Sequence, residues 1–258
     1  MDKINTLNAL QFASISNDFL VDFISSSISL DTALVTPEDV QSILDGAIDG
    51  LNPRVVSLVN NYLDGFLFAI ALTTKQEPFN ENDLKDIHEK IVNNFAKGGL
   101  YRNVDISIRG SNHTPPSFIK VYDRMKKYFD EINNENNDVY YNIAFSHLQL
   151  MKIHPFLDGN GRLARIVLNY MLLKNGLKPI IINYSNKERY FELLEEFFVD
   201  YEEIIADINS ELLEKYAISE QFSSSFPQFE QLIRETKPKF AKGQIIGPFT
   251  LSSILNDK

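Results

Sequence analysis

The amino-acid sequence predicts an all-α fold, a bundle of helices that carries one short β-hairpin. Apolar residues recur at helical spacing in most segments of the chain, which indicates helices that pack through one face. Residues 104–109 instead alternate apolar and polar side chains, which is typical of a strand.

Start and stop residues bound the predicted helices. Thr36 and Pro37 provide an N-cap and a first helical residue, and Asn175-Gly176 ends a later helix. Ser185 and Glu188 form a capping-box pattern for the next helix. Helices are therefore predicted at 36–46, 53–73, 82–96, 117–132, 138–153 and 162–174, and from Ser185 onward.

The predicted hairpin lies between two of these helices. After the alternating residues 104–109, the segment 110–112 (Gly-Ser-Asn) supplies a turn. Pro115 and Pro116 then block further regular pairing because proline has no backbone N–H.

Composition excludes several classes of protein. The chain of 258 residues has a formal net charge of −10, so it lacks the basic field that binding to DNA or RNA requires. It has no cysteine, which suits a reducing cytoplasm. The first twenty residues are too polar for a signal peptide, and no run approaches the roughly 20 apolar residues that span a bilayer. We therefore expect a cytoplasmic protein without a nucleic-acid or membrane partner.

The segment HPFLDGNGRLAR, residues 154–165, gathers the residues that suit chemistry. His154 falls at the C-terminal end of the helix 138–153, where Pro155 ends that helix. A histidine in this position can take up a proton near neutral pH. We therefore expect His154 to act as a base.

The second half of this segment predicts an anion site. Gly159, Asn160 and Gly161 form a loop with few side-chain obstructions at the N-terminus of the next helix, where N–H groups and the macrodipole attract anions. Arg162, Arg165 and Asn169 share one polar face of that helix, and two guanidinium groups suit a polyphosphate. Asp158 precedes the loop and could hold Mg²⁺ that bridges phosphate oxygens.

Simpler interpretations compete with this one. The pattern Gly159-x-Gly161-x-x-Ala164 matches a dinucleotide fingerprint, but a helix rather than a strand precedes it. His147, His154 and Asp158 could form a metal site, although His147 by itself is more typical of a packed core histidine. His88 and His113 stand apart from this segment, so a surface or structural role is expected for them.

The segment resembles the signature of the Fic family, HPFx[DE]GNGRxxR, at every specified position. Further stretches are similar to that family: 99–116 to its flap, 144–153 to the helix that enters the motif, and 175–194 to the part that follows. The resemblance implies the Fic fold, an all-α bundle with a β-hairpin flap over a site for ATP and Mg²⁺.

The resemblance also implies roles for the residues. His154 would be the general base that activates a Ser, Thr or Tyr hydroxyl of a target protein for attack on the α-phosphorus of ATP. Asp158 would bind Mg²⁺, and Phe156 would anchor the loop in the core. The phosphates would be held by Gly159, Asn160, Gly161, Arg162 and Arg165. Ser111, Asn169 and Tyr190 would lie at the flap or the adenine.

One position departs from the family pattern. Many members have an inhibitory helix, [ST]xxxE[GN], whose glutamate pairs with the second arginine of the motif, here Arg165. In the stretch Ser25–Asp31 the resemblance puts Ser29 at the place of that glutamate. Asp31 has the spacing SxxxD from Ser27, but it would need a half-turn shift, and its side chain has a shorter reach than that of glutamate. The sequence therefore predicts that glutamate-type inhibition is weakened or absent.

The resulting hypothesis is AMP transfer from ATP to a protein hydroxyl. Alternatives are other nucleotidyl or phosphate transfer or AMP removal on the same scaffold, and a non-catalytic nucleotide-binding interaction module. ATP and a target protein are the expected partners, and a homodimer is a further candidate. The predicted organisation is an N-terminal helical region at 1–60, a Fic catalytic core at 61–200, and a C-terminal helix and tail at 201–258.

Overall fold

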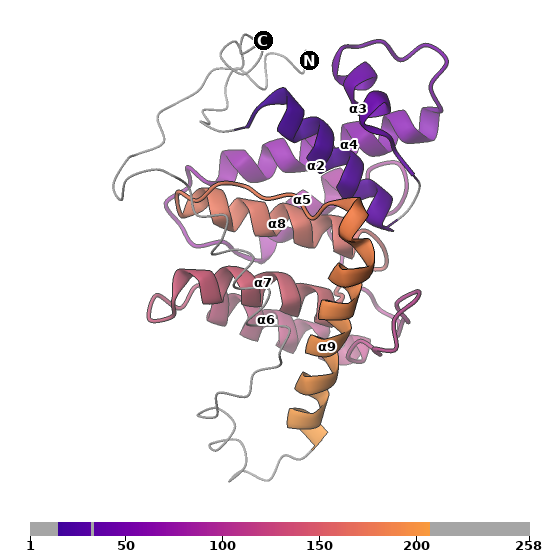
Figure 1. Ribbon diagram of the computed structural model, residues 1–258. Coiled ribbons are helices and arrows are strands. Elements are labelled where there is room, and N and C mark those ends of the chain that lie inside the picture. The colour runs from indigo at the N-terminus through magenta and orange to yellow at the C-terminus, as the bar shows by residue number, and fades with distance from the viewer. Residues whose placement is uncertain (1–14, 32–33, 207–258) are drawn as a thin grey trace. The chain divides into compact units, whose positions relative to one another are not determined.

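The computed structural model describes residues 15–31 and 34–206, and the predicted all-α class is confirmed because these residues form helices and no strand (Figure 1). The α-helices in chain order are α2 (Asn17–Asp31), α3 (Pro37–Leu44), α4 (Pro53–Leu72), α5 (Glu81–Ile91), α6 (Val121–Ile132), α7 (Val139–Ile153), α8 (Asn160–Lys174) and α9 (Lys187–Ala206). Two 3₁₀ turns, η1 (Phe118–Lys120) and η2 (Tyr184–Asn186), precede α6 and α9.

The described residues form two compact units, each with its own core. The α8 unit consists of residues 15–31, 34–100 and 158–185, with α2, α3, α4, α5 and α8. The α7 unit consists of residues 101–157 and 186–206, with α6, α7 and α9. The boundaries predicted at residues 60 and 200 stay a prediction, and the predicted tail from residue 207 onward lies outside the described residues.

Helix α4 is the central element of the α8 unit, and it packs against α2, α3, α5 and α8. Asn52 caps it by accepting the N–H of Arg54, and Pro53 supplies its first residue. Its side chains Val59, Tyr62 and Phe66 are fully buried, and burying an apolar side chain of this size stabilises a fold by about 1.5–3 kcal/mol. By length and composition alone α4 could cross a membrane, contrary to our expectation, but buried core helices share these properties.

Helix α5 crosses α4 at a glycine. A Cβ atom on Gly65 would overlap Cγ2 of Ile91 and lie 3.6 Å from the carbonyl oxygen of Ile87, so no larger residue fits between the helices. Helix α5 ends at Ile91, earlier than the predicted 96. Asn94 adopts a left-handed φ of 63°, a conformation that ends helices, and the sequence analysis did not recognise it as a stop.

Helix α8 differs from the predicted amphipathic helix because it is buried on all sides, from Asn160 to Leu173. Its apolar residues fill the core of the α8 unit. Its polar residues Arg162, Arg165 and Asn169 are buried as well, since other elements of the unit accept their hydrogen bonds. The sequence pattern correctly separates an apolar and a polar face of α8, and in the tertiary structure both faces are buried.

In the α7 unit, α7 packs against α6 and α9. Asp138 caps α7 by accepting the N–H groups of Tyr140 and Tyr141. The fully buried hydroxyl groups of Tyr128 on α6 and Ser146 on α7 lie 2.6 Å apart and form a hydrogen bond across the core. This bond satisfies two polar groups that would be costly to bury unpaired.

The predicted hairpin is not confirmed, because residues 101–117 form no strand. A side chain joins the two ends of the segment instead of a strand ladder. A carboxylate oxygen of Asp105 accepts the backbone N–H of Phe118 at 2.7 Å. A turn bond from Ser111 N–H to the carbonyl of Ile108 remains. Two short strands that end at Pro115 have too few ladder bonds to be stable without a third strand, which explains the irregular backbone.

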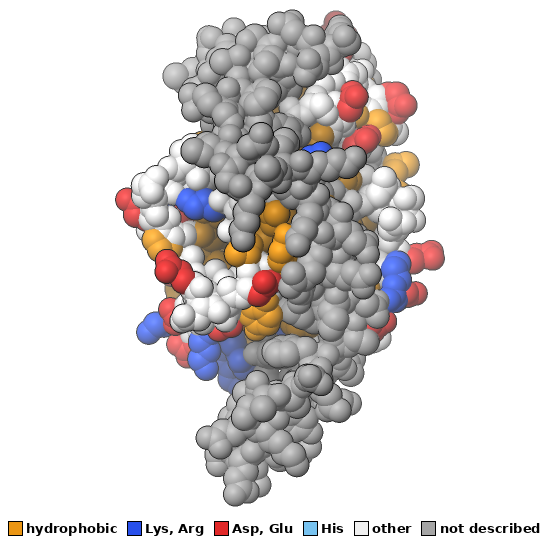
Figure 2. Space-filling view, turned by 60° about the vertical axis from the view of Figure 1, so that its left-hand side comes forward, with side chains coloured by type: hydrophobic (Ala, Val, Ile, Leu, Met, Phe, Trp, Pro, Cys, Tyr) orange, Lys and Arg blue, Asp and Glu red, His pale blue; other side chains and the backbone are white. Residues whose placement is uncertain are grey.

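On the face that Figure 2 shows, acidic, basic and hydrophobic side chains are all visible among the described residues. The large hydrophobic side chains that are exposed include Leu34, Val104, Ile119, Tyr122 and Leu157. Some large apolar side chains therefore remain at the surface of the described residues.

Replacing Gly65 with alanine is expected to destabilise the chain. The added methyl group overlaps Ile91, and overpacking of this kind costs about 1–3 kcal/mol of the free energy of unfolding. Urea unfolding followed by circular dichroism measures the change, with Ser57→Ala, at a half-buried position of α4, as the control. An unchanged midpoint for Gly65→Ala would show that the two helices separate without cost.

Candidate active site

The segment 154–165 begins in the α7 unit and ends in the α8 unit, so its two parts are described within their own units. The loop before α8 belongs to the α8 unit. Gly159 is the N-cap of α8 with a left-handed φ of 77°, a conformation that favours glycine. A Cβ atom at this position would also lie 2.8 Å from Cγ1 of Val92. Both the backbone conformation and the lack of space therefore favour glycine. The first turn of α8 then presents N–H groups that have no partner within the helix.

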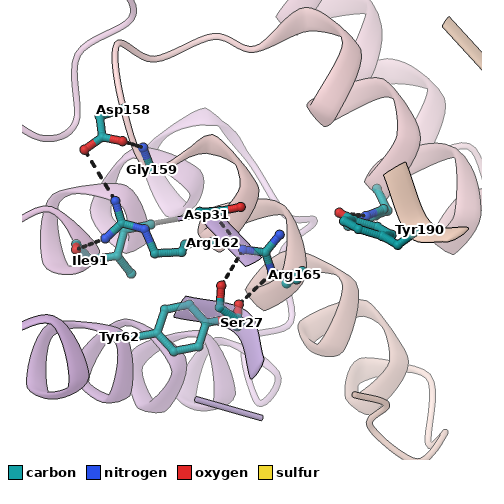
Figure 3. A network of polar contacts seen from close by, with 10 residues as sticks. Ser27, Asp31, Tyr62, Ile91, Asp158, Gly159, Arg162, Arg165 and Tyr190 are labelled. Carbon is teal, nitrogen blue, oxygen red and sulfur yellow. Dashed lines mark hydrogen bonds and ion pairs between the residues drawn. The ribbon is translucent and has the colours of Figure 1, made fainter. Parts of the chain in front are cut away.

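Asp158 lies beside this turn with its side chain 58% exposed. One carboxylate oxygen accepts the N–H of Gly159 at 2.7 Å, and the other lies 3.4 Å from Nη2 of Arg162 (Figure 3). No group of three His, Asp or Glu side chains within residues 15–31 and 34–206 could hold a metal by itself. A single exposed carboxylate fits Mg²⁺, which usually takes one or two carboxylates and completes its shell with water and substrate phosphates.

Arg162 is buried beneath the loop. Its Nη1 donates to the carbonyl oxygen of Ile91 at 3.4 Å, at the C-terminal end of α5. In the described part of the chain its Nε has no hydrogen-bond partner. The hydrogen bonds of Arg162 to Ile91 and Asp158 are both 3.4 Å long and therefore weak. The guanidinium can thus still bind an anion at the N-terminus of α8.

Arg165 is only 1% exposed and pairs with helix α2. Its Nε donates to Oγ of Ser27 at 2.6 Å, and its Nη2 donates to the carbonyl oxygen of Ser27 at 2.8 Å (Figure 3). The same Nη2 lies 2.6 Å from Oδ2 of Asp31. Ser27 in turn donates to the hydroxyl of Tyr62 at 2.6 Å, and burial raises the pKa of Tyr62, so it stays neutral.

The carboxylate of Asp31 lies against the first turn of α8. A Cβ atom on Gly161 would be 2.6 Å from Oδ2 and 2.7 Å from Oδ1 of Asp31, so the carboxylate occupies the space that a side chain would fill. The positive end of the helix dipole and the guanidinium of Arg165 both stabilise a negative charge there. The carboxylate of Asp31 therefore lies at the helix end where the sequence predicts an anion site, and that site stays a prediction.

This arrangement corrects the assignment of Ser29. Ser29 exchanges two hydrogen bonds with the backbone of Val35, while Arg165 binds Ser27 and Asp31 instead. The expectation that Asp31 would be too short is wrong, because Ser27 and Asp31 are separated by one helical turn and share a face of α2. The missing side chain of Gly161 allows α2 and α8 to approach closely enough for the shorter carboxylate to reach Arg165.

His88 on α5 is a residue of this site that the sequence analysis assigned only a surface or structural role. It is 2% exposed, and Nε2 lies 2.9 Å from the carbonyl oxygen of Asp158. The N–H of Gly99 donates to Nδ1 at 3.0 Å. Burial lowers the pKa of His88 to about 4, which keeps the imidazole neutral at physiological pH. Its contact with the loop has a sequence separation of 70 residues, and no local pattern signals it.

His154 belongs to the α7 unit and forms the C-cap of α7 with a left-handed φ of 50° and ψ of 61°. This conformation is uncommon outside glycine and is typical of functional residues that their surroundings hold in place. Nδ1 lies 3.2 Å from the carbonyl oxygen of Met151, which can only accept a hydrogen bond. The neutral imidazole therefore carries its proton on Nδ1 and its lone pair on Nε2, the form that a general base requires.

Arg102 holds the backbone around His154. Its buried guanidinium donates through Nε to the carbonyl oxygen of His154 at 2.9 Å and through Nη2 to that of Ile153 at 3.4 Å. It also donates to the carbonyl oxygens of Pro116 and Val104. A cation at the C-terminus of α7 complements the helix dipole. Arg102 is thus a cap for α7 that the sequence analysis placed only within the flap resemblance.

The other predicted residues have contacts of their own. Phe156 is fully buried against the ring of Tyr101, as expected for an anchor. His147 is a buried core histidine, and its Nε2 lies 3.0 Å from the hydroxyl of Tyr190. Ser111 donates to Glu195 on α9, and Asn169 exchanges hydrogen bonds with the backbone of Ile180. A place for Ser111, Asn169 and Tyr190 at the flap or the adenine stays a prediction.

Comparison with known proteins shows what part of this chain is similar to. Residues 78–172 match the sequence model of the Fic/DOC family. Protein adenylyltransferase Fic of Nematostella vectensis is 31% identical over 130 residues, which are 48% of this chain and 30% of the relative. The same-named protein of Drosophila willistoni is 27% identical over 164 residues, which are 60% of this chain and 32% of the relative. The chain thus spans about a third of the length of these relatives.

Solved structures show the same fold. A Fic-domain-containing signalling protein from Bacteroides thetaiotaomicron has a TM-score of 0.71 at 20% identity, covering 84% of this chain and 82% of that one. Fic-1 from C. elegans has a TM-score of 0.63 at 18% identity, covering 92% of this chain and 66% of that one. At these identities the likeness concerns the fold.

Replacing Arg102 with methionine is expected to lower the free energy of unfolding by about 3 kcal/mol or more. The change leaves several carbonyl oxygens without a donor, and a hydrogen bond from a charged group contributes about 1.5–3 kcal/mol. Differential scanning calorimetry measures the effect, and Arg109→Met, at an exposed position of the same unit, is the control. Equal melting temperatures for the two variants would contradict a capping role for Arg102.

Proposed function

We propose that this chain, through its Fic/DOC domain at residues 78–172, transfers AMP from Mg²⁺-bound ATP to a Ser, Thr or Tyr hydroxyl of a target protein. The observation that carries the proposal is the anion site at the N-terminus of α8, where Arg165 and the helix end hold a carboxylate in the place proposed for phosphate. Relatives named protein adenylyltransferase Fic support the reaction.

The reaction assigns one task to each group. Nε2 of His154 takes the proton of the target hydroxyl, whose oxygen forms a bond to the α-phosphorus as the bond to the pyrophosphate oxygen breaks. The N–H groups of the first turn of α8 and Arg162 hold the phosphates and stabilise the charge on the leaving pyrophosphate. Asp158 would hold Mg²⁺, which when bound neutralises charge on the phosphate oxygens.

Asp31 would restrain this reaction. Its carboxylate repels phosphate from the first turn of α8 and occupies Nη2 of Arg165. This proposal replaces the prediction of weakened or absent inhibition, which depended on Ser29. The chain as described is therefore in a restrained state, and displacement of Asp31 would free Arg165 for the nucleotide.

The position of Asp31 also favours a second candidate, removal of AMP from a modified protein. A carboxylate at the anion site can accept a proton from water, which attacks the phosphorus and releases AMP and the protein hydroxyl. AMP removal was an open alternative from the sequence, and Asp31 supplies a carboxylate beside Arg165 that could serve it.

Incubation with α-labelled ATP and Mg²⁺ in a cell lysate tests AMP transfer. We expect protein labelling by the Asp31→Ala chain, and a loss of at least about 100-fold when His154→Ala is added, since a general base contributes about 10²–10⁴-fold. Chelation of Mg²⁺ by EDTA should abolish the label. Label from γ-labelled ATP instead would assign phosphate transfer and contradict the proposal.

Asp31→Ala is expected to raise AMP transfer roughly tenfold or more over the natural chain, because a competing hydrogen-bonded ion pair of about 1.5–3 kcal/mol is lost. Initial rates of labelling measure the effect, and Asp22→Ala, at an exposed position of the same helix, is the control. A lower rate for Asp31→Ala would rule out restraint by this residue. Release of labelled AMP from a modified protein by the natural chain, but not by Asp31→Ala, would establish AMP removal.

A further inference from the structure

His88 makes contacts that the proposed reaction does not use. It lies in the last turns of α5, and its two ring nitrogens bind the backbone of two different loops of the α8 unit. One loop is 97–99, and the other is the start of the phosphate loop, Asp158-Gly159. We propose that His88 is a positioning residue that fixes the Asp158–Gly159 peptide, and with it the Asp158 carboxylate, for binding of the Mg²⁺-nucleotide, an inference that rests on the proposed function.

The hydrogen bonds determine the tautomer of His88. The N–H of Gly99 can only donate, so Nδ1 accepts and carries no proton. The carbonyl oxygen of Asp158 can only accept, so Nε2–H donates to it at 2.9 Å. Both ring nitrogens are therefore committed, and the ring is fixed at both ends.

This bond sets the direction of the next N–H group. A trans peptide is planar, and its C=O and N–H point in opposite directions. With the carbonyl of Asp158 directed at His88, the N–H of Gly159 points away from α5, where it donates to the carboxylate of Asp158 at 2.7 Å. The same bond therefore orients both the first N–H of the phosphate loop and the carboxylate proposed to hold Mg²⁺.

The loop needs such an anchor. Gly159 adopts a φ of 77° and has no side chain to restrict it, so the peptide before it could rotate among many conformations. A Cβ atom on Gly159 would lie 3.6 Å from Nε2 of His88, which shows how closely the loop approaches α5. The loop 97–99 is equally close, since a Cβ on Gly98 would overlap the backbone of Glu89.

A neutral donor suits this position better than a cation. The carbonyl of Asp158 would accept from lysine or arginine as readily as from histidine. A positive side chain, however, would face the buried guanidinium of Arg162 and could not accept the N–H of Gly99. Neutral histidine is able to donate to one loop and accept from the other.

Two variants separate the two hydrogen bonds. His88→Gln places an amide N–H₂ near the position of Nε2 and keeps the donor to Asp158. His88→Asn places an amide oxygen near the position of Nδ1 and keeps only the acceptor for Gly99. Both are neutral and polar, so each controls for the other.

The parent chain is the full chain that carries Asp31→Ala, and its affinity for Mg²⁺-ATP is measured by titration calorimetry. The melting temperature of every variant shows whether it is folded. We expect Kd of the Gln variant within about threefold of the parent chain and Kd of the Asn variant raised about tenfold, the value of one well-placed hydrogen bond. If only the Gln variant folds, the comparison of its Kd with that of the parent chain decides whether the proposal holds. Equal Kd values for Gln and Asn, or a Gln variant that folds but binds as weakly as Asn, would overturn the proposal.

The rate of AMP transfer separates this inference from the proposed function. A parent chain that binds Mg²⁺-ATP but labels no protein contradicts AMP transfer, while the comparison of Kd values still tests His88. A parent chain that labels protein, with Gln and Asn variants of equal KM, contradicts the role of His88 alone.

Discussion

The ion pair between Arg165 and Asp31 is the interaction on which the α8 unit depends. A guanidinium that is 1% exposed must be paired, since a buried charge without a partner is costly. Ser27 and Asp31 provide that pairing from one face of α2, and this brings α2 against the first turn of α8. The same contact that completes the core therefore fills the anion site.

Glycine makes these close contacts possible. Gly161 lets the carboxylate of Asp31 reach α8, Gly159 lets the loop lie on α5, and Gly65 lets α5 lie on α4. At each position a methyl group would meet another atom at less than van der Waals distance. The geometry of the site thus depends on how closely these backbone segments approach their neighbours, as well as on the side chains that carry the chemistry.

Two buried side chains, one in each unit, serve the loops around the motif in a similar way. In the α7 unit, Arg102 binds the carbonyl oxygens around His154 and holds that residue in a left-handed conformation. In the α8 unit, His88 binds the carbonyl of Asp158. Both act on the backbone, because the direction of a peptide determines where the groups beside it point.

The sequence by itself determined the helices and the motif, because helical periodicity, caps and the segment 154–165 are local. It predicted the anion site before α8, since a glycine loop at a helix N-terminus has that property in any fold. It could not decide which residue of α2 meets Arg165: the family resemblance puts Ser29 at the place of the pairing glutamate, whereas Asp31 forms the ion pair. That choice depends on how closely two helices approach at Gly161. The roles of His88 and Arg102 also required tertiary structure, because their partners lie 70 and 52 residues away along the chain.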